Sequence, residues 1–307
     1  MSSTSGPRLA LLVCDTPLPS IVAAQGAYPI IFTTWLLASA RRDMKLQLDP
    51  YDVVHKEYPD PENYDGILIT GSAASAYEET DWVLELVKFV RLVIDHHPKV
   101  KIIGICFGHQ IIAQALGGPD SVRRNELGWE AGVYTVSLTP AGERVFSEKQ
   151  ISIHEMHRDH VVRLPPGCIN LGSTDKCEIQ GLVKLYDTSK TDAALPENFS
   201  GADRQTDSNA LATGLPTGNS STEPTKTEAP STASSVPEEI NLAEDVHILS
   251  VQGHPEFTSF MVTEIVKTRG EKGIMPPETV KDSMERASRK HDGDGMIGEA
   301  IWKVLGL

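Results

Sequence analysis

A single cysteine lies between two closely spaced glycines in Gly104-Ile105-Cys106-Phe107-Gly108, directly after the apolar residues of KVKII. This pattern is typical of a nucleophile at a sharp turn from a strand into a helix, because the glycines allow close backbone approach. A helix that begins after Cys106 would direct its positive N-terminal end at the sulfur and favour the thiolate. The backbone amide of Phe107 could then donate to an oxyanion. The alternative is a buried structural cysteine between two glycines at which a helix packs.

A thiolate nucleophile needs a base, and a candidate follows the apolar run HILSV near the end of the chain. His254, in Gly253-His254-Pro255-Glu256, would lie at the carboxyl end of a strand, where open α/β sheets carry their sites. Glu256 could reach back to the His254 ring across the turn at Pro255. Alone, this motif would indicate an ordinary turn. Together, the two motifs predict a Cys-His-Glu triad at one edge of a sheet.

Alternating strand and helix patterns in the first part of the chain would position the cysteine. Short apolar runs, typical of strands buried on both faces, alternate with helical patterns, and the joints between them are short. This order predicts a parallel sheet with helices on both faces. The strands are expected at residues 8–15, 65–72 and 99–105, and the helices at residues 28–42, 81–97 and 107–118.

The pattern changes after Gly118 to short strand-like runs, which predict an antiparallel extension of the same sheet. Two helical patterns near the end of the chain are expected to pack on the flank of the sheet. The additional strands are expected at residues 132–138, 150–156, 169–174 and 179–185, and the last helices at residues 277–290 and 296–307.

Residues 187–245 are rich in Ser, Thr, Ala, Pro, Gly, Asp and Glu and contain no Trp or Tyr. Such a segment cannot bury enough apolar surface to offset the entropy lost on ordering, so we expect it to be disordered. A loop of this length is uncommon within a compact domain unless it is an insertion. A strand-like run resumes at residues 246–257. We therefore expect one domain over residues 8–307, interrupted by this insertion and preceded by a disordered N-terminus at residues 1–7.

The composition argues against several classes of protein. The net charge of −14 over 307 residues argues against nucleic-acid binding, which needs a basic face. The sequence has no run of about 18 apolar residues, which would indicate a membrane span. The first residues lack the basic flank of a signal peptide. The four cysteines have no CxxC spacing and would stay reduced inside a cell. We therefore expect a cytoplasmic protein.

The two motifs, in the order Cys, His, Glu, resemble those of the class I glutamine amidotransferases. GICFGHQ is similar to the nucleophile motif of that family, and GHPEF is similar to its His-x-Glu motif. The resemblance extends from Arg8 to about Val266, apart from the insertion. It implies a flavodoxin-like open sheet, mostly parallel with an antiparallel extension and with helices on both faces. Gly71-Ser72-Ala73 replaces the usual Gly-Gly-Pro, as in the stand-alone branch that resembles the glutaminase domain of guanine-nucleotide synthetase.

The resemblance also implies a reaction and a role for each residue of the triad. Cys106 would attack the side-chain amide of glutamine, forming a glutamyl thioester and releasing ammonia. His254 would take the thiol proton and supply it to the leaving amine, and Glu256 would hold the His254 ring.

The same resemblance assigns an oxyanion hole and a pocket for the substrate. The backbone N–H of Gly71 would complete the oxyanion hole with that of Phe107. Gln110, in the family pattern G-x-C-x-G-x-Q, would help to shape the glutamine pocket. His157 and Asp159 would line the mouth of this pocket.

The segment HEMHRDH could instead suggest a metal site, because it places three histidines and two acids close together. These residues are His154, Glu155, His157, Asp159 and His160. The spacing would suit one helical face, but the flanks indicate strand and loop, and no second ligand cluster follows. We therefore expect no metal ion and no cofactor. In the nearby ELGWEAGVYTV, Glu126 and Trp129 could belong to the core or to the pocket, and we favour packing.

The destination of the ammonia is not encoded in a recognisable motif. No GxxxxGK[ST] pattern occurs, so a glutamine amidotransferase of this kind would need a separate synthetase or acceptor subunit. One alternative is a γ-glutamyl peptide or amide hydrolase with the same triad, and another is a non-catalytic regulatory subunit. A stress-response thiol protein of the same broad fold is a further alternative. Those proteins have a histidine directly after the cysteine, whereas Phe107 follows here and His109 comes later.

Overall fold

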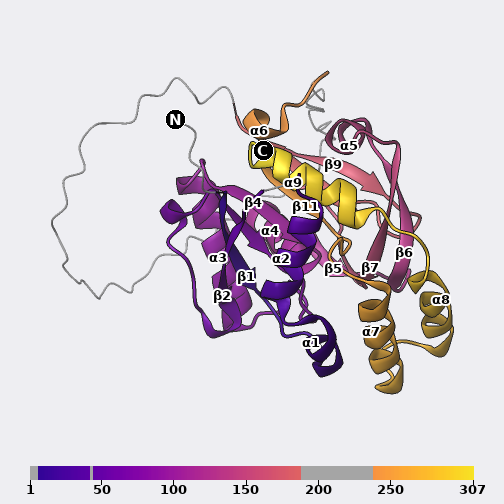
Figure 1. The fold of residues 1–307 in the computed structure, drawn as a ribbon. Helices are drawn as coiled ribbons and strands as arrows, with labels where there is room; N and C mark the ends of the chain where they lie inside the picture. The colour runs from indigo at the N-terminus through magenta and orange to yellow at the C-terminus, as the bar shows by residue number, and fades with distance from the viewer. Residues whose placement is uncertain (1–5, 42–43, 188–237) are drawn as a thin grey trace, which may run out of the picture. The chain divides into compact units, whose positions relative to one another are not determined.

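Strand β1 (Arg8–Val13) is the simplest example of how the apolar runs are used. Leu9 and Leu11 belong to one hydrophobic cluster, whereas Ala10 and Leu12 belong to a second cluster on the other side of the sheet. A continuous apolar run therefore buries both faces of the strand, as expected for a parallel sheet covered on both sides. The computed structural model describes residues 6–41, 44–187 and 238–307 (Figure 1).

The main sheet has nine strands in the order β2-β1-β3-β4-β11-β10-β9-β6-β7. The first five strands in this order pair in parallel, and the others pair antiparallel, which confirms the predicted mostly parallel sheet with an antiparallel extension. The parallel strands after β1 are β2 (Gln47–Asp52), β3 (Gly66–Ile69), β4 (Lys101–Ile105) and β11 (Val246–Val251). The extension contains β10 (Gly181–Leu185), β9 (Cys168–Ser173), β6 (Glu130–Leu138) and β7 (Gln150–His157). A separate antiparallel pair is formed by β5 (Val122–Arg124) and β8 (Asp159–Val161).

Helices cover both faces of the sheet, as predicted. Helices α2 (Tyr28–Ala38) and α9 (Gly298–Val304) contribute to one hydrophobic cluster, and Trp302 Nε1 donates to the carbonyl of Leu36 at 2.8 Å. Helices α3 (Asp81–His96) and α4 (Phe107–Gly117) contribute to the other cluster. The remaining helices are α1 (Pro19–Gln25), α5 (Pro140–Phe146), α6 (Leu242–Asp245), α7 (Ser259–Glu271) and α8 (Pro277–Ala287).

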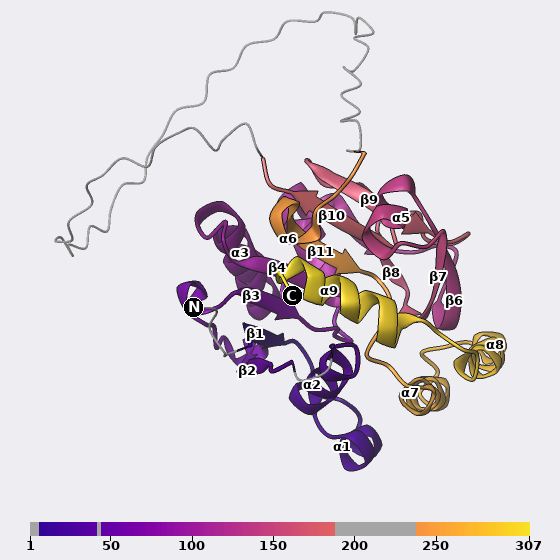
Figure 2. The same ribbon diagram turned by 45° about the horizontal axis from the view of Figure 1, so that its top comes forward.

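Helices α7 and α8 lie side by side next to the antiparallel end of the sheet (Figure 2). Helix α8 packs on β6, in agreement with the expected position of the last helices on the flank of the sheet. Helix α7 begins soon after the segment that contains His254, and Thr258 caps its first turn by accepting from the N–H of Met261. The end of β11 and the start of α7 are therefore held close together.

Strand β2 was not expected from the sequence. Its residues are mostly polar, none of them is fully buried, and it contains Pro50. This strand lies at the edge of the sheet, where a proline is tolerated because one side of the strand has no partner. Strand β2 has no buried apolar run, so its pattern resembles that of a loop.

Most of the expected insertion, residues 188–237, and residues 1–5 of the expected disordered N-terminus lie outside the described residues. The described residues that follow each of these two segments are more ordered than expected. Pro7 is buried, and its carbonyl accepts from the N–H of Gln47. Residues 242–245 form α6, in which Leu242 is buried, so the expected insertion boundary at residue 245 is too late. Leu242 belongs to the hydrophobic cluster, and Ile240 packs against the same cluster, which accounts for the difference.

Within the described part of the chain, no single helix is long and apolar enough to cross a membrane. Helices α1 and α2 meet the criteria of length and composition only when taken together, and they are bent by 46° relative to each other.

Candidate active site

Cys106 occupies the corner between β4 and α4. Its backbone has φ +51° and ψ −101°, which is rare for a residue other than glycine. The corner is fixed on both sides, because the N–H of Cys106 donates to Val251 of β11 at 2.9 Å and its carbonyl accepts from the N–H of Gln110 at 3.1 Å. A strained backbone that is held in this way is typical of a functional site. Helix α4 begins at Phe107, so its N-terminus is next to the sulfur.

The two glycines of the motif allow the helix to pack closely on the sheet. A side chain at Gly104 would place its Cβ 2.6 Å from Ile112 Cδ1 and 2.8 Å from the backbone of Gly108. A side chain at Gly108 would come within 2.4 Å of the carbonyl oxygen of Ile69 in β3. Real Cβ atoms essentially never make such short contacts, so both positions need glycine for the observed strand-to-helix turn.

His254 follows the end of β11 and lies next to Cys106. Its ring is buried, is stacked on Phe257 at 3.9 Å, and has Nδ1 2.9 Å from Glu256 Oε1. Burial alone would lower the pKa of His254. However, the charges of Cys106 and Glu256 and hydrogen bonds to both raise the pKa to about 10. The arrangement therefore favours an imidazolium beside the sulfur.

Two glutamines lie behind the sulfur. Gln252 Nε2 lies 3.6 Å from Cys106 Sγ, and Gln252 Oε1 accepts from Gln110 Nε2 at 3.1 Å. Gln110 Nε2 also donates to the carbonyl of Asp159 at 3.0 Å. These contacts connect α4, β11 and the start of β8, so the thiol, the histidine and the loop before β8 are held in one arrangement.

Two cavities of about 250 Å³ each adjoin the corner. The first is lined by Cys106 and Gln110, and the second by His254 and Phe257. They share the lining residues Ser72, Ala73, Met156, Arg269 and Ile274, so they form two lobes of one cleft.

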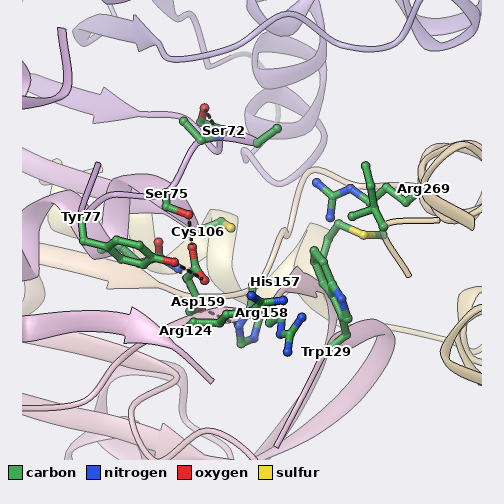
Figure 3. Close-up of a pocket in the computed structure, with 15 residues that line it drawn as sticks. Ser72, Ser75, Tyr77, Cys106, Arg124, Trp129, His157, Arg158, Asp159 and Arg269 are labelled. Carbon is green, nitrogen blue, oxygen red and sulfur yellow. Dashed lines mark hydrogen bonds between the residues drawn. The ribbon is translucent and has the colours of Figure 1, made fainter. Parts of the chain in front are cut away.

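The first lobe is positively charged, although the chain as a whole has a net charge of −14. Three arginines line it, Arg124, Arg158 and Arg269, together with the carboxylate of Asp159 (Figure 3). This carboxylate accepts from Ser75 Oγ and, at 3.2 Å, from the Tyr77 hydroxyl. Such a lobe is suited to an anionic ligand, because the Asp159 carboxylate already accepts two hydrogen bonds and shares the lobe with three guanidinium groups.

His157 also lines the first lobe, but its ring belongs to a buried cluster. His157 Nε2 lies 3.2 Å from Glu130 Oε2 and 3.3 Å from Glu155 Oε2, and Nδ1 lies 3.0 Å from the carbonyl of Asp159. Burial would lower the pKa of His157, but the two carboxylates raise it well above its ordinary value. Burial also raises the pKa of Glu155, to about 7. We infer that this cluster supports the pocket wall from behind.

The same cluster differs from the metal site considered in HEMHRDH. Glu130, His157 and Cys177 have potential ligand atoms within 4.8 Å of one another, whereas His154 and His160 do not belong to this group. The alternation of side chains along β7 places His154 and His157 on opposite faces. The absence of a metal ion and of a cofactor remains a prediction.

The structure brings Cys106, His254 and Glu256 together at one edge of the sheet, as the motifs predict. It places Gly71 after β3, where an added Cβ would lie 2.6 Å from His254 Cε1. The other sequence-predicted residues also lie at this edge: Phe107 begins α4, Gln110 contacts Gln252, and His157 and Asp159 line the first lobe. The roles of these residues in catalysis and binding remain predictions.

Several residues of the cleft were not identified from the sequence. Arg124, Arg158, Arg269, Ser75, Tyr77 and Gln252 carry no motif of their own. Arg158 lies within HEMHRDH, and Gln252 directly precedes the histidine motif. Trp129 packs on the core as expected, but it also lines the cleft. Glu126 is exposed, contrary to the expected packing role, because it lies in the turn between Asn125 and Gly128.

Comparisons with known proteins agree with this geometry. The family model "Glutamine amidotransferase class-I" matches residues 31–189, more than half of the 307 residues; the match includes Cys106 and ends before the segment with His254. A glutamine amidotransferase-like protein of Schizosaccharomyces pombe is 39% identical over 181 residues, which cover 56% of this chain and 72% of that protein.

Gamma-glutamyl peptidase 2 of Arabidopsis thaliana is 34% identical over 180 residues, which cover 56% of this chain and 69% of that protein. Among solved structures, a glutamine amidotransferase of Thermotoga maritima has the same fold, with a TM-score of 0.60 and 15% identity over 98% of this chain and 99% of that chain. The matched residues, the fold and the similarity to these relatives lead to one conclusion: the chain belongs to the class I glutamine amidotransferase family.

Proposed function

We propose that the chain is a thiol hydrolase that cleaves the side-chain amide of glutamine, or the equivalent amide of a γ-glutamyl compound. The observation that carries this proposal is the position of Cys106 at a strained strand-to-helix corner beside His254, whose ring is bonded to Glu256. Membership of the glutamine amidotransferase family supports the same chemistry.

The reaction begins with attack of the Cys106 sulfur on the γ-carbonyl carbon. A C–S bond forms, and the carbonyl oxygen becomes an oxyanion. The C–N bond then breaks, and the leaving nitrogen takes a proton from His254, which leaves a γ-glutamyl thioester on Cys106. Water attacks the thioester, His254 accepts a proton from that water, and the C–S bond breaks to release glutamate and restore the thiol–imidazole pair.

The oxyanion would be bound by backbone N–H groups. The first N–H groups of a helix have no partner within the helix, and that of Phe107 begins α4 next to the sulfur. The N–H of Gly71, in the loop after β3, would be the second donor, and this loop is adjacent to the His254 ring.

The glutamyl part of the substrate would occupy the first lobe. Its α-carboxylate would be bound by Arg124 or Arg158, since a guanidinium matches the geometry of a carboxylate. Gln110 would shape the wall between this lobe and Cys106, as its hydrogen bonds to Gln252 and to the Asp159 carbonyl suggest. The positive lobe therefore favours a substrate with at least one carboxylate.

If free glutamine is the substrate, ammonia leaves from the His254 side of the cleft. As a glutamine amidotransferase, the chain would transfer this ammonia to an acceptor on a separate synthetase subunit. A second candidate function is that of a γ-glutamyl peptide hydrolase. It is supported by the volume of the lobe beside His254, about 250 Å³, and by the similarity to Gamma-glutamyl peptidase 2.

The proposal is tested by incubating the purified chain with glutamine or with γ-glutamylmethylamide and measuring the release of glutamate. Cys106→Ser should remove the activity. Cys168→Ser should retain it, because Cys168 does not line the cleft and burial raises the pKa of its thiol to about 11. Cleavage that persists in Cys106→Ser would contradict the thiol mechanism, and no cleavage of either compound by the unmodified chain would contradict the proposed function.

A further inference from the structure

The lobe beside His254 is larger than the release of ammonia requires. The leaving nitrogen takes its proton from His254 in the proposed reaction, so the leaving group must lie on the His254 side of the cleft. This lobe has a volume of about 250 Å³. A cavity needs only about 10–15 Å³ to hold a molecule of the size of water or ammonia. The lobe can therefore hold an amine that is much larger than ammonia.

Arg269, near the end of α7, lines both lobes. Its guanidinium lies over the ring of Trp129, with 5.0 Å between Cζ and the ring centroid. Figure 3 shows Arg269 and Trp129 at one end of the first lobe, while Ser75, Tyr77 and Asp159 lie at the other end with Cys106 between them. Because Arg269 also lines the lobe beside His254, it lies on the leaving-group side of the cleft.

The guanidinium of Arg269 has a buried N–H donor for which the described part of the chain supplies no acceptor. Its Nη1 is buried and has no hydrogen-bond partner among the described residues. Asp15 is the acidic residue that lines the second lobe, but its carboxylate accepts from the N–H of Thr16 at 2.7 Å and from the N–H of Ala73 at 2.8 Å. A buried donor of a charged group without a partner is unfavourable, and a ligand carboxylate would satisfy it.

We infer that Arg269 binds a carboxylate carried by the leaving amine, so that the chain prefers γ-glutamyl amino acids or peptides to glutamine. This inference rests on the proposed cleavage of γ-glutamyl amides by Cys106. The planar fork of the guanidinium suits a carboxylate, and Trp129 keeps the guanidinium in place by stacking. The amine of the substrate would then lie between His254 and Arg269, with its carboxylate in the second lobe.

The inference is tested with two substrates that differ in the leaving group alone. γ-Glutamylglycine has a carboxylate on the leaving amine, and γ-glutamylmethylamide lacks it. The measured quantity is the ratio of kcat/KM for the two substrates, obtained from the release of glutamate by one preparation. Because both values come from the same preparation, any difference in the folded fraction of a variant cancels in this ratio.

Arg269→Gln should lower the ratio by about 10-fold to 100-fold, the effect expected from the loss of a hydrogen-bonded charge pair. Arg269→Lys should lower it less, since the charge remains but the planar fork is lost. Lys267→Gln removes an exposed positive charge from the same helix and should leave the ratio unchanged.

An equal loss for both substrates in Arg269→Gln would overturn the inference, because Arg269 would then bind the glutamyl part or support the fold. Unchanged kcat/KM values for both substrates in Arg269→Gln would overturn it as well. If the unmodified chain cleaves neither substrate, the proposed function itself fails and this inference falls with it. Cleavage of both substrates with a loss confined to γ-glutamylglycine is the expected result.

Discussion

The His254 ring is buried, yet its surroundings favour its protonated form. Its Nδ1 is bonded to Glu256, its face is stacked on Phe257, and the added Cβ of a larger residue at Gly71 would meet its edge. The nearby Cys106 provides the second partner. With contacts on all these sides the ring has little freedom to move, which is the property required of a group that transfers protons between a thiol and a leaving amine.

His254→Ala should lower the rate of amide hydrolysis by about 10²–10⁴-fold, because the thiol loses its proton acceptor and the leaving amine its proton donor. Glu256→Gln should cost less, since the ring keeps a hydrogen-bond partner. His109→Ala is the control: His109 is buried beyond the corner, with Nδ1 2.8 Å from Ser250 Oγ, and should affect the rate mildly. Loss of activity in His109→Ala but not in His254→Ala would favour the stress-response thiol protein instead.

The free energy of unfolding should fall as the pH rises from 6.5 towards 10. The pKa of His254 is raised from 6.5 to about 10 in the folded chain, so the folded state binds this proton more tightly than the unfolded chain does. The stabilisation is present in full below pH 6.5 and is lost as the pH rises through about 10. Urea unfolding at several pH values should show a smaller alkaline decrease for His254→Ala, and equal decreases would show that His254 is not the group responsible.

At the scale of elements, the site is made where three strand ends meet. Strand β3 leads into the loop with Gly71, β4 leads into Cys106, and β11 leads into His254. The three strands are neighbours in the sheet, and their parallel pairing brings their carboxyl ends to one edge. Close packing of these ends, and not only the identity of the reacting residues, therefore determines the geometry of the cleft.

Gly71→Ala should reduce activity by about 10²-fold while the chain remains folded. The new Cβ would lie 2.6 Å from His254 Cε1 and would displace the ring, and displacements of about 1 Å can have effects of this size. The backbone N–H at this position is retained, so the variant tests the position of the ring rather than the oxyanion hole. Gly295→Ala, where an added Cβ meets nothing within 4 Å, should leave both rate and stability unchanged. Retained activity in Gly71→Ala would show that the ring can shift without consequence.

The elements that could be predicted are those with buried apolar patterns. Strands β1, β3 and β4 and helices α3 and α4 follow from such patterns, whereas the polar edge strand β2 does not. The candidate triad could be located because each half of it lies in a short motif next to a strand. Arg269 could not be located in this way, since its place in the cleft depends on how α7 packs after β11, and no local pattern contains that information.

For the whole molecule, the long polar segment connects two strands that are already neighbours. Strands β10 and β11 pair antiparallel with Leu185 opposite Val246, and the N–H of Tyr186 donates to the carbonyl of Asp245 at 2.8 Å. The two ends of the segment therefore lie next to each other, and a much shorter connection would join the strands. Loop-closure entropy changes slowly with loop length, so the fold does not depend on the number of residues between them.

Deletion of residues 190–235 should leave Tm and any hydrolytic rate nearly unchanged, because their composition offers few residues for a core. A longer deletion, of residues 190–245, is the matched comparison. It also removes α6, which buries Leu242 and accepts from Lys101 Nζ through the Ala243 carbonyl, and it should lower Tm. Equal losses of stability in the two variants, measured by thermal unfolding, would contradict the boundary placed before α6.

The central position of β11 affects how the chain is completed during synthesis. β11 lies between β4 and β10, although both of these strands leave the ribosome before it. Until β11 inserts, β4 and β10 each present an edge whose backbone groups can pair with another chain. Newly made chains are thus most exposed to misassociation late in translation. The cysteine, meanwhile, remains without its histidine until β11 takes its place in the sheet.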